Sequence, residues 1–387
     1  MLSTKLPHLW IDATCIVPDG KGAAVYAIAL LQALQALQPP AYFTVLVRQE
    51  AIGRLQDSLS SPCPNWEIQV TKVKSAHFWH LFDLPRLLKK HRPDLLHVLG
   101  EAPLGRVPVP YTIAIHELPH LYRRYVGFPS QSLYQWGSHW LTEALLPGTC
   151  RRAERILTLS KSTASDLIDE FNLTGKQLNV VYPAAAACFL AVTAQSGSDW
   201  CQSLPRPYLL TFATGDRREL PEQVVQAFGA IANQIPHHLV IAGRCPDWQK
   251  STLTRIAHRF DCHSRLYFTG FVPDPDLPFL YRDADAYIEM SRYEGFGLQV
   301  CEAMATGTVA IAANVSSLPE VVGNAEYLVP LNDCATLSEK LLQLLSHPNQ
   351  IQSKKNLVQQ QAALFSWERC ARETWETLNC VLKNSVE

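Results

Sequence analysis

Short apolar runs alternate with amphipathic stretches along this chain, and that alternation constrains its fold more than any other feature. In the first half, the apolar runs and helix-like stretches occur at residues 9–17, 24–37, 42–48, 84–91, 95–99, 111–115 and 156–160. The second half repeats the pattern at 208–214, 221–235, 238–242, 249–260, 266–269, 276–282, 286–290 and 309–312. Strands that alternate with helices predict a parallel sheet with crossover helices. Each half is therefore predicted to form a Rossmann-like, doubly wound α/β domain, with the two domains facing each other across a cleft.

Length and a break in composition indicate where the two domains meet. A chain of 387 residues exceeds the size at which a single hydrophobic core usually stops growing. An alanine run at 184–187, followed by a stretch with Ser, Gly and Pro up to residue 207, is the best linker candidate. We expect a first domain at 1–190, a second at 191–364 and a terminal amphipathic helix at 365–387.

The composition limits the partners and the location of the protein. Hydrophobic residues make up 47% and charged residues 18%, and the formal net charge is -1, so neither disorder nor nucleic-acid binding driven by bulk charge is expected. No segment approaches the roughly 18 apolar residues of a membrane span, and residues 1–8 lack a signal-peptide core, which predicts a cytoplasmic protein. The 11 cysteines are scattered without a C-x-x-C pair, so free thiols are expected rather than a zinc site.

Two stretches leave peripheral contact with the inner face of a membrane open as an alternative. Residues 87–92 and 122–128 combine cations with apolar groups, as an interfacial surface does. The ordinary solvated face of an amphipathic helix is the favoured interpretation of both.

The segment 292–302 indicates a ligand-binding turn that leads into a helix. It follows an apolar run of strand character and places Glu294 in a glycine-bracketed turn, with Glu302 about one helical turn further on. Gly295 and Gly297 permit close backbone approach, and the helix that follows presents unpaired N–H groups. Carboxylates so placed accept hydrogen bonds from two sets of hydroxyls, such as those of a sugar and a ribose. A capped helix with solvated glutamates is the alternative.

Motifs in this segment and along nearly the whole chain resemble one family. The most specific are Tyr293-Glu-Gly-Phe-Gly-Leu298 and the two that follow at 302–308 and 316–323, and others lie at 22–34, 92–97, 115–118, 153–160, 180–183, 239–244, 270–274 and 280–285. Together they resemble the family-4 retaining glycosyltransferases of GT-B fold, close to the mannosyl- and glucosyltransferase-like members. That resemblance implies that the terminal helix returns to the first domain.

The resemblance implies a set of site residues position by position. Glu302 would hold the ribose hydroxyls, Glu294 would contact the donor sugar, and His116 would reach that sugar from the first domain. Catalytic roles are implied for His116, Arg217, Arg218 and Glu294, and donor contacts for Gly22, Gly215, Arg244, Gly295, Phe296, Gly297, Leu298 and Glu302. The implied donor is a UDP- or GDP-sugar bound without a metal ion or other cofactor, and the implied acceptor is a hydroxyl of a glycan or a lipid-linked glycan. Ser317 and Glu320 are expected to form a capping box.

The chain departs from the family pattern where the leaving phosphates would bind. Aligned without a gap, Arg218 takes the position of the family arginine and Glu219 that of its lysine. A shorter loop would instead let Arg217 and Arg218 supply both cations, and this alignment is slightly favoured; two solvated surface arginines are the alternative. Ala24 replaces a second glycine of the first glycine loop, and Ala184 stands where an acidic residue is usual.

Three functions follow from this pattern. The first is a metal-independent retaining hexosyltransferase, whose barrier falls mainly through stabilisation of the leaving diphosphate. The second is a weakened relative that binds a nucleotide sugar or glycan as a partner subunit, which the departures at Ala24, Ala184 and Glu219 motivate. The third, a related epimerase or sugar phosphorylase, is favoured by no residue.

Overall fold

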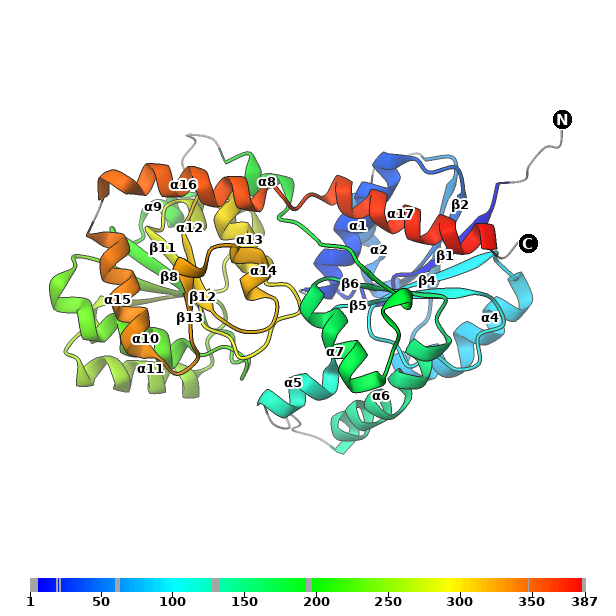
Figure 1. Ribbon diagram of the computed structural model, residues 1–387, viewed down its shortest axis with the longest axis horizontal. Coiled ribbons are helices and arrows are strands. Elements are labelled where there is room, and N and C mark those ends of the chain that lie inside the picture. Colours follow the sequence, from blue (N-terminus) through cyan, green and yellow to red (C-terminus); the bar gives the residue numbers. More distant parts are fainter. Residues whose placement is uncertain are drawn as a thin grey trace. The chain divides into compact units, whose positions relative to one another are not determined.

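The computed structural model describes residues 6–18, 20, 22–59, 63–126, 133–192, 197–346 and 348–384. The chain divides into two compact units (Figure 1). Unit 1 comprises Met1–Pro183 and Ser366–Glu387, and unit 2 comprises Ala184–Phe365. Residues 184–190, assigned to the first domain from sequence, lie in unit 2.

Within its described residues, unit 1 contains a seven-stranded sheet in the order β3-β2-β1-β4-β5-β6-β7, in which all neighbouring strands are parallel. The strands are β1 (His8–Asp12), β2 (Tyr42–Arg48), β3 (Trp66–Thr71), β4 (Leu95–Leu99), β5 (Tyr111–Ile115), β6 (Arg155–Thr158) and β7 (Leu178–Val180). Their order reverses between β1 and β4. Ligands of such sheets bind beyond the carboxyl ends of the strands at this reversal.

The helices of unit 1 cover both faces of this sheet. They are α1 (Ala23–Leu37), α2 (Ile52–Ser58), α3 (Ala76–Phe78), α4 (Leu84–His91), α5 (Pro119–Val126), α6 (Leu133–Arg152), α7 (Lys161–Phe171) and α17 (Trp367–Asn384). A π-helical turn, Trp79–Asp83, joins α3 to α4. The last helix, α17, lies along α1, so the end of the chain packs on the unit formed by its beginning (Figure 1).

Within its described residues, unit 2 contains a six-stranded parallel sheet in the order β10-β9-β8-β11-β12-β13. The strands are β8 (Tyr208–Phe212), β9 (His238–Ala242), β10 (Leu266–Gly270), β11 (Ala286–Glu289), β12 (Ala310–Ala313) and β13 (Leu328–Val329). The helices are α8 (Ala187–Leu190), α9 (Asp199–Gln202), α10 (Pro221–Ile231), α11 (Asp247–Arg259), α12 (Leu277–Arg282), α13 (Leu298–Ala305), α14 (Leu318–Val322), α15 (Cys334–Leu345) and α16 (Pro348–Ala362). The strand order reverses between β8 and β11.

The loops that follow β8 and β11 are joined through their backbones. The N–H of Leu220 donates to the carbonyl of Met290 at 2.7 Å, and the N–H of Arg292 donates to the carbonyl of Arg218 at 2.9 Å. Glu219 and Ser291 form an antiparallel bridge between these bonds. Two segments far apart in sequence therefore form one rigid wall at the point where the strand order reverses.

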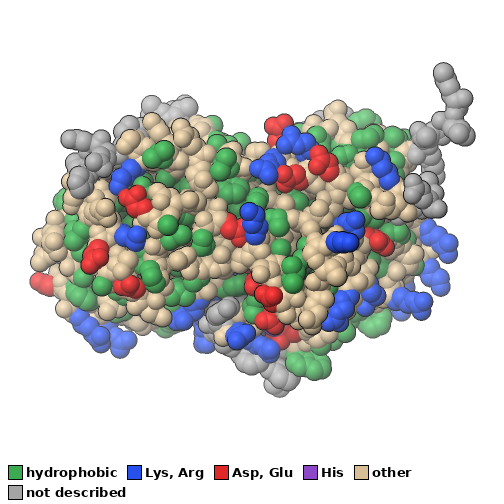
Figure 2. All heavy atoms as spheres, in the orientation of Figure 1, with side chains coloured by type: hydrophobic (Ala, Val, Ile, Leu, Met, Phe, Trp, Pro, Cys, Tyr) green, Lys and Arg blue, Asp and Glu red, His purple; other side chains and the backbone are tan. Residues whose placement is uncertain are grey.

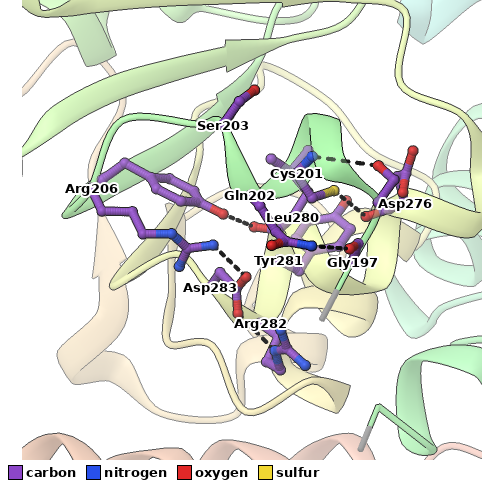
Figure 3. A network of polar contacts seen from close by, with 12 residues as sticks. Gly197, Cys201, Gln202, Ser203, Arg206, Asp276, Leu280, Tyr281, Arg282 and Asp283 are labelled. Atoms are coloured by element: carbon purple, nitrogen blue, oxygen red, sulfur yellow. Dashed lines mark hydrogen bonds and ion pairs between the residues drawn. The ribbon is translucent and has the colours of Figure 1, made fainter. Parts of the chain in front are cut away.

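Side-chain contacts fix the segment that enters β8 (Figure 3). The guanidinium of Arg206 lies 2.7 Å from the carboxylate of Asp283, which also accepts from Arg282 at 2.7 Å. The hydroxyl of Tyr208, the first residue of β8, donates to the carbonyl of Leu280 at 2.7 Å. These bonds tie the start of β8 to α12 and so set the position of the loop at its far end.

The predicted fold class, two doubly wound α/β domains, is confirmed. The predicted bounds of β2, β4, β5, β9 and α4 coincide with those observed. Sequence analysis missed β3, β7 and β13. The first is an edge strand whose residues are mostly only half-buried, and the last has two residues, so neither has the apolar run that marks an interior strand. Helix α6 was missed because it contains Pro147 and has no apolar stripe.

No helix in the described ranges combines the length and apolarity needed to cross a bilayer.

Gly297 generates a prediction about stability. It begins α13 at φ 94°, and a Cβ built on it would lie 2.8 Å from Cδ2 of Leu318. We expect Gly297→Ala to lower the free energy of unfolding by roughly 2 kcal/mol, because a methyl group there has both an unfavourable φ and a steric overlap. Urea denaturation measures the change. Gly53→Ala in α2 is the control, since a Cβ there meets nothing within 4 Å; an equal loss in both variants would contradict the prediction.

Candidate functional site

Three serines hold the turn between β11 and α13. The N–H of Glu294 donates to Oγ of Ser316 at 2.9 Å, and Oγ of Ser317 donates to the carbonyl of Glu294 at 2.9 Å. Oγ of Ser291 donates to Oε1 of Glu294 at 2.8 Å. Both the backbone and the side chain of Glu294 are therefore fixed before any ligand arrives. The predicted capping box is wrong, because Ser317 uses its hydroxyl on this turn and not on the N–H groups of α14.

The glycines and Phe296 complete this turn. Gly297 takes the positive φ expected of the turn, whereas Gly295 does not. Phe296 is buried against Phe365, with ring centroids 5.3 Å apart. Leu298 is the first residue of α13, so the unpaired N–H groups of the first helical turn follow Glu294 closely in the chain. An anion or a polar sugar oxygen is the natural partner of such N–H groups.

A second carboxylate, Glu289, lies at the end of β11 and is only 7% exposed. Its carboxyl group accepts a hydrogen bond from the hydroxyl of Tyr287. Burial, reinforced by the negative charge of Glu294, raises the pKa of Glu289 to about 8. Burial also raises the pKa of Glu294, although the nearby positive charge of Arg218 opposes that shift. Both carboxyl groups therefore sit where ionisation is costly.

Glu302 lies inside α13, as predicted. The hydroxyl of Tyr281 donates to its Oε2 at 3.4 Å, and burial raises the pKa of Glu302 to about 8. The rings of Tyr281 and Tyr287 pack edge to face, with centroids 5.3 Å apart. Two tyrosines in contact thus each donate to one carboxyl group, Tyr281 to that of Glu302 and Tyr287 to that of Glu289.

The loop after β8 carries the residues expected to meet the leaving phosphates. Arg218 is half-buried and bonded to Asp216 (Nη2–Oδ2 3.0 Å), while Arg217 is exposed. Glu219 is turned toward the protein: its two carboxylate oxygens accept from the N–H and the hydroxyl of Thr214, each at 2.7 Å. Burial raises the pKa of Glu219. Gly215 takes φ 85°.

A cavity of about 550 Å³ opens beside this loop in unit 2. Its lining residues come from the two joined loops and from the starts of α10 and α11, and they are Asp216, Arg217, Glu219, Leu220, Glu222, Trp248, Gln249 and Arg292. Three acidic residues and two arginines thus line one hollow, together with Trp248. Arg244 is exposed and lies over the ring of Phe271, 4.8 Å from its centroid, rather than among these lining residues.

The two predicted residues of unit 1 occupy the carboxyl edge of its own sheet. His116 follows β5 and is 8% exposed, with its ring edge to face against Tyr26 at 4.7 Å between centroids. The carboxylate of Glu101 accepts from the N–H groups of His116 and Glu117 and lies 3.8 Å from Nδ1 of His116. Gly22 precedes α1 at φ 48°.

The structure thus groups the predicted residues by unit. In unit 2, Gly215, Arg217 and Arg218 lie in the loop after β8, residues 294–297 form the turn joined to that loop, and Leu298 and Glu302 lie in α13. Unit 1 holds His116 and Gly22. Sequence analysis missed Glu289, Glu101 and the three-serine clamp. A carboxylate that ends an apolar strand, as Glu289 does, is a signal that could have marked the first of these.

Two family comparisons cover most of the chain. Residues 20–185 match Glycosyltransferase Family 4, and residues 203–362 match Glycosyl transferases group 1. The first match lies in unit 1 except for its last two residues, and the second match lies in unit 2.

Individual relatives agree with these matches. O-antigen chain mannosyltransferase B of Escherichia coli is 31% identical over 57% of this chain and 59% of its own length. The serotype-specific mannosyltransferase WbdA of Escherichia coli is 26% identical over 76% of this chain and 38% of its own length. The chain therefore spans about three fifths or less of these relatives. Anabaena HepE, solved in complex with UDP-glucose, superposes with a TM-score of 0.72 over 97% of this chain and 100% of that chain at 15% identity, a likeness that shows the fold.

Two family matches in sequence order, each on a doubly wound parallel sheet, identify this chain as a member of the glycosyltransferases of GT-B fold, with a family 4 domain followed by a group 1 domain.

Proposed function

We propose that this protein transfers a hexose, with retention of anomeric configuration, from a nucleoside diphosphate sugar to a hydroxyl of a glycan or lipid-linked acceptor. One observation carries the proposal: the clamped turn of Glu294 lies at the strand-order reversal of unit 2, joined by backbone bonds to the loop of Arg218. The names of the relatives support it, since two are mannosyltransferases and a structural neighbour was solved with UDP-glucose.

The proposed donor contacts follow the chemistry of each group. Glu302 accepts hydrogen bonds from the ribose hydroxyls, because carboxyl oxygens inside a helix pair well with two adjacent hydroxyl donors. Glu294 does the same for the sugar, with its side chain already oriented by Ser291. Preorganised acceptors lose little entropy on binding and so favour one sugar orientation.

The leaving diphosphate gains negative charge during transfer, and in this proposal groups of the chain stabilise it instead of a metal ion. The N–H groups that begin α13 and the guanidinium of Arg218 supply that stabilisation. Arg218 is bonded to Asp216 and must share its donors with the phosphates. Arg217 is exposed on the cavity wall, and the bond to Asp216 is made by Arg218. We therefore propose Arg217 as the second cation.

A second candidate function rests on Glu219. Its carboxylate is bonded within the loop that should carry a cation, and its charge acts on Glu289. A carboxylate at this place stabilises the leaving diphosphate less than a cation does, as expected of a relative that binds a nucleotide sugar or glycan without turning it over. The two candidates differ in turnover and not in binding.

Nucleotide binding is the first test. In a thermal-shift panel of UDP, GDP, ADP and their sugars, we expect at least one nucleotide sugar to raise the melting temperature, because a ligand that binds only the folded state stabilises it. Glu302→Gln should reduce that shift, since an amide accepts with one oxygen only. Glu339→Gln, on the exposed face of α15, is the matched control. A panel without any shift would reject the proposed donor class.

Turnover is the second test. Wild-type protein with a donor that binds and a mannan-type or lipid-linked acceptor should release free nucleotide, and Glu294→Ala should lower the rate by at least about 100-fold, as expected when a group that contacts the reacting sugar is lost. Full activity in Glu294→Ala would contradict the proposed contact between Glu294 and the reacting sugar. Binding without release from the wild type across a broad acceptor screen would favour the second candidate.

We also propose peripheral contact with the inner face of an anionic membrane, through an exposed stripe on the stretch from α3 to α4. Phe78 and Phe82 are about half exposed, with ring centroids 5.2 Å apart, and Arg86, Lys89 and Lys90 continue the stripe in solvent. In the view of Figure 2, Lys and Arg side chains gather toward the end of unit 1 that carries α4. The second stretch, 122–128, extends outside the described residues.

Sedimentation with phosphatidylglycerol vesicles tests this contact. Lys89→Ser with Lys90→Ser should weaken binding roughly 30-fold, at about 1 kcal/mol per cation near an anionic surface. Arg255→Ser with Arg259→Ser, two exposed cations on α11, is the control pair. Equal sedimentation of both double variants and the wild type would contradict the assignment of the stripe.

A further inference from the structure

Three carboxyl groups, one buried and two half-buried, lie at the strand-order reversal of unit 2. Glu219 comes from the loop after β8, Glu289 ends β11, and Glu294 lies in the turn that follows. The antiparallel bridge between Glu219 and Ser291 joins the two segments. We call these three residues the carboxyl cluster.

The hydrogen bonds that reach the cluster come from neutral donors. Glu219 accepts from the N–H and hydroxyl of Thr214, and Glu294 accepts from the hydroxyl of Ser291. Glu289 accepts from the phenol of Tyr287, which also lies 3.4 Å from Oε1 of Gln299 on α13. Neutral donors orient a carboxyl group but leave its charge uncompensated.

Most charged groups around the cluster come from the same two loops; Glu222 belongs to α10, and the Cys245 thiol, which feels the charge of Glu219, follows β9. On the side of β8 they are Asp216 and Arg218, which are bonded to each other. Burial raises the pKa of Glu289 and of Glu294; the charge of Glu294 adds to the rise at Glu289, and the charge of Arg218 opposes the rise at both. Arg217 and Arg292 line the cavity next to Glu219 and Glu222. Among the described residues, carboxyl groups therefore outnumber guanidinium groups around the cluster.

A site with more carboxylates than guanidinium groups binds a diphosphate weakly unless one carboxylate gains a proton. Two or three further negative charges beside three carboxyl groups make their ionisation still less favourable, because like charges in a poorly hydrated environment repel strongly. The proton comes from solvent and stays on a carboxyl oxygen, so no covalent bond of the ligand is broken. Any such uptake must make binding weaker as pH rises.

We propose that the carboxyl cluster takes up a proton when a nucleoside diphosphate binds, so that Glu219 and Glu289 tune the affinity of this site for its donor to pH. This inference rests on the proposed function, since it places the diphosphate of the donor beside the loop of Arg218. Glu289 holds the added proton. Glu219 places a negative charge in the loop, where the family pattern has a lysine.

Calorimetric titration with UDP and GDP tests the proposal. Measurements at pH 8.5 in two buffers of different ionisation enthalpy give the number of protons exchanged, at a pH where free phosphate groups, with a second pKa near 6, no longer titrate. We expect uptake of roughly half a proton or more per nucleotide, and an affinity that falls several-fold per pH unit between about pH 7.5 and 9.5.

Three variants separate the members of the cluster from the background. Glu289→Gln keeps an acceptor for Tyr287 but cannot ionise, so proton uptake should fall and the pH dependence should flatten. Glu219→Gln can still accept from the N–H of Thr214 through its oxygen and donate to the Thr214 hydroxyl through its amide. It removes a charge, so affinity at pH 8.5 should rise several-fold. Glu339→Gln should match the wild type.

A measurement without ligand supports or rejects the same assignment. The pKa of Glu289 in the folded protein, about 8, lies above its ordinary value of 4.5, so the folded state holds the extra proton between these values. The free energy of unfolding should therefore fall as pH rises from about 5 to about 8, and Glu289→Gln should lose less over that window.

The outcomes distinguish this inference from the proposed function. Nucleotide binding without proton exchange, or with exchange unchanged in both Glu289→Gln and Glu219→Gln, overturns the inference and leaves the proposed function standing. Binding of neither nucleotide at any pH overturns both. Proton uptake that Glu289→Gln removes, with Glu339→Gln unaffected, supports it.

Discussion

The parallel pairing of β8 with β11 is the interaction on which the candidate site depends. Leu209 and Leu210 pair with Ala286 and Tyr287, and this register brings the ends of both strands to the same edge of the sheet. The backbone bridge at Glu219 and Ser291 continues the contact into the loops. Without that pairing, Arg218 and Glu294 would be two surface residues on unrelated loops. With it, a guanidinium and a carboxyl group share one partly dehydrated wall.

That wall combines rigidity with electrostatic strain. Hydroxyl groups of Ser291, Ser316 and Ser317 fix the turn of Glu294, and Thr214 fixes Glu219. Burial of four carboxyl groups, including Glu302, opposes their ionisation and costs folding free energy at alkaline pH. Such strain is typical of sites whose polar groups are positioned for a ligand rather than for stability. The three-serine clamp gives the polar groups defined partners while leaving their outer faces to a substrate.

Much of the fold could be predicted because its signals are local. Interior strands such as β4 and β5 are fully buried and mostly apolar, and α4 has its leucines on one face, so each could be recognised from its own residues. Strands without that signal were missed: β3 sits at the sheet edge and β13 is two residues long. The capping box failed for a related reason, since the hydroxyl of Ser317 bonds to a segment more than twenty residues away.

The amino-acid sequence by itself determined the alternation of strands and helices, the glycine turn of 294–297 and the family to which the chain belongs, because each depends on residue types at short spacing. The tertiary structure decided the environment of each charge. Glu219 turns inward onto Thr214, and Arg217 stays in solvent. Glu219 becomes a neighbour of Glu289 and Glu294 only because β8 and β11 lie side by side. Burial and electrostatic coupling are properties of neighbours in space, and residues 219 and 294 become neighbours only when the sheet forms.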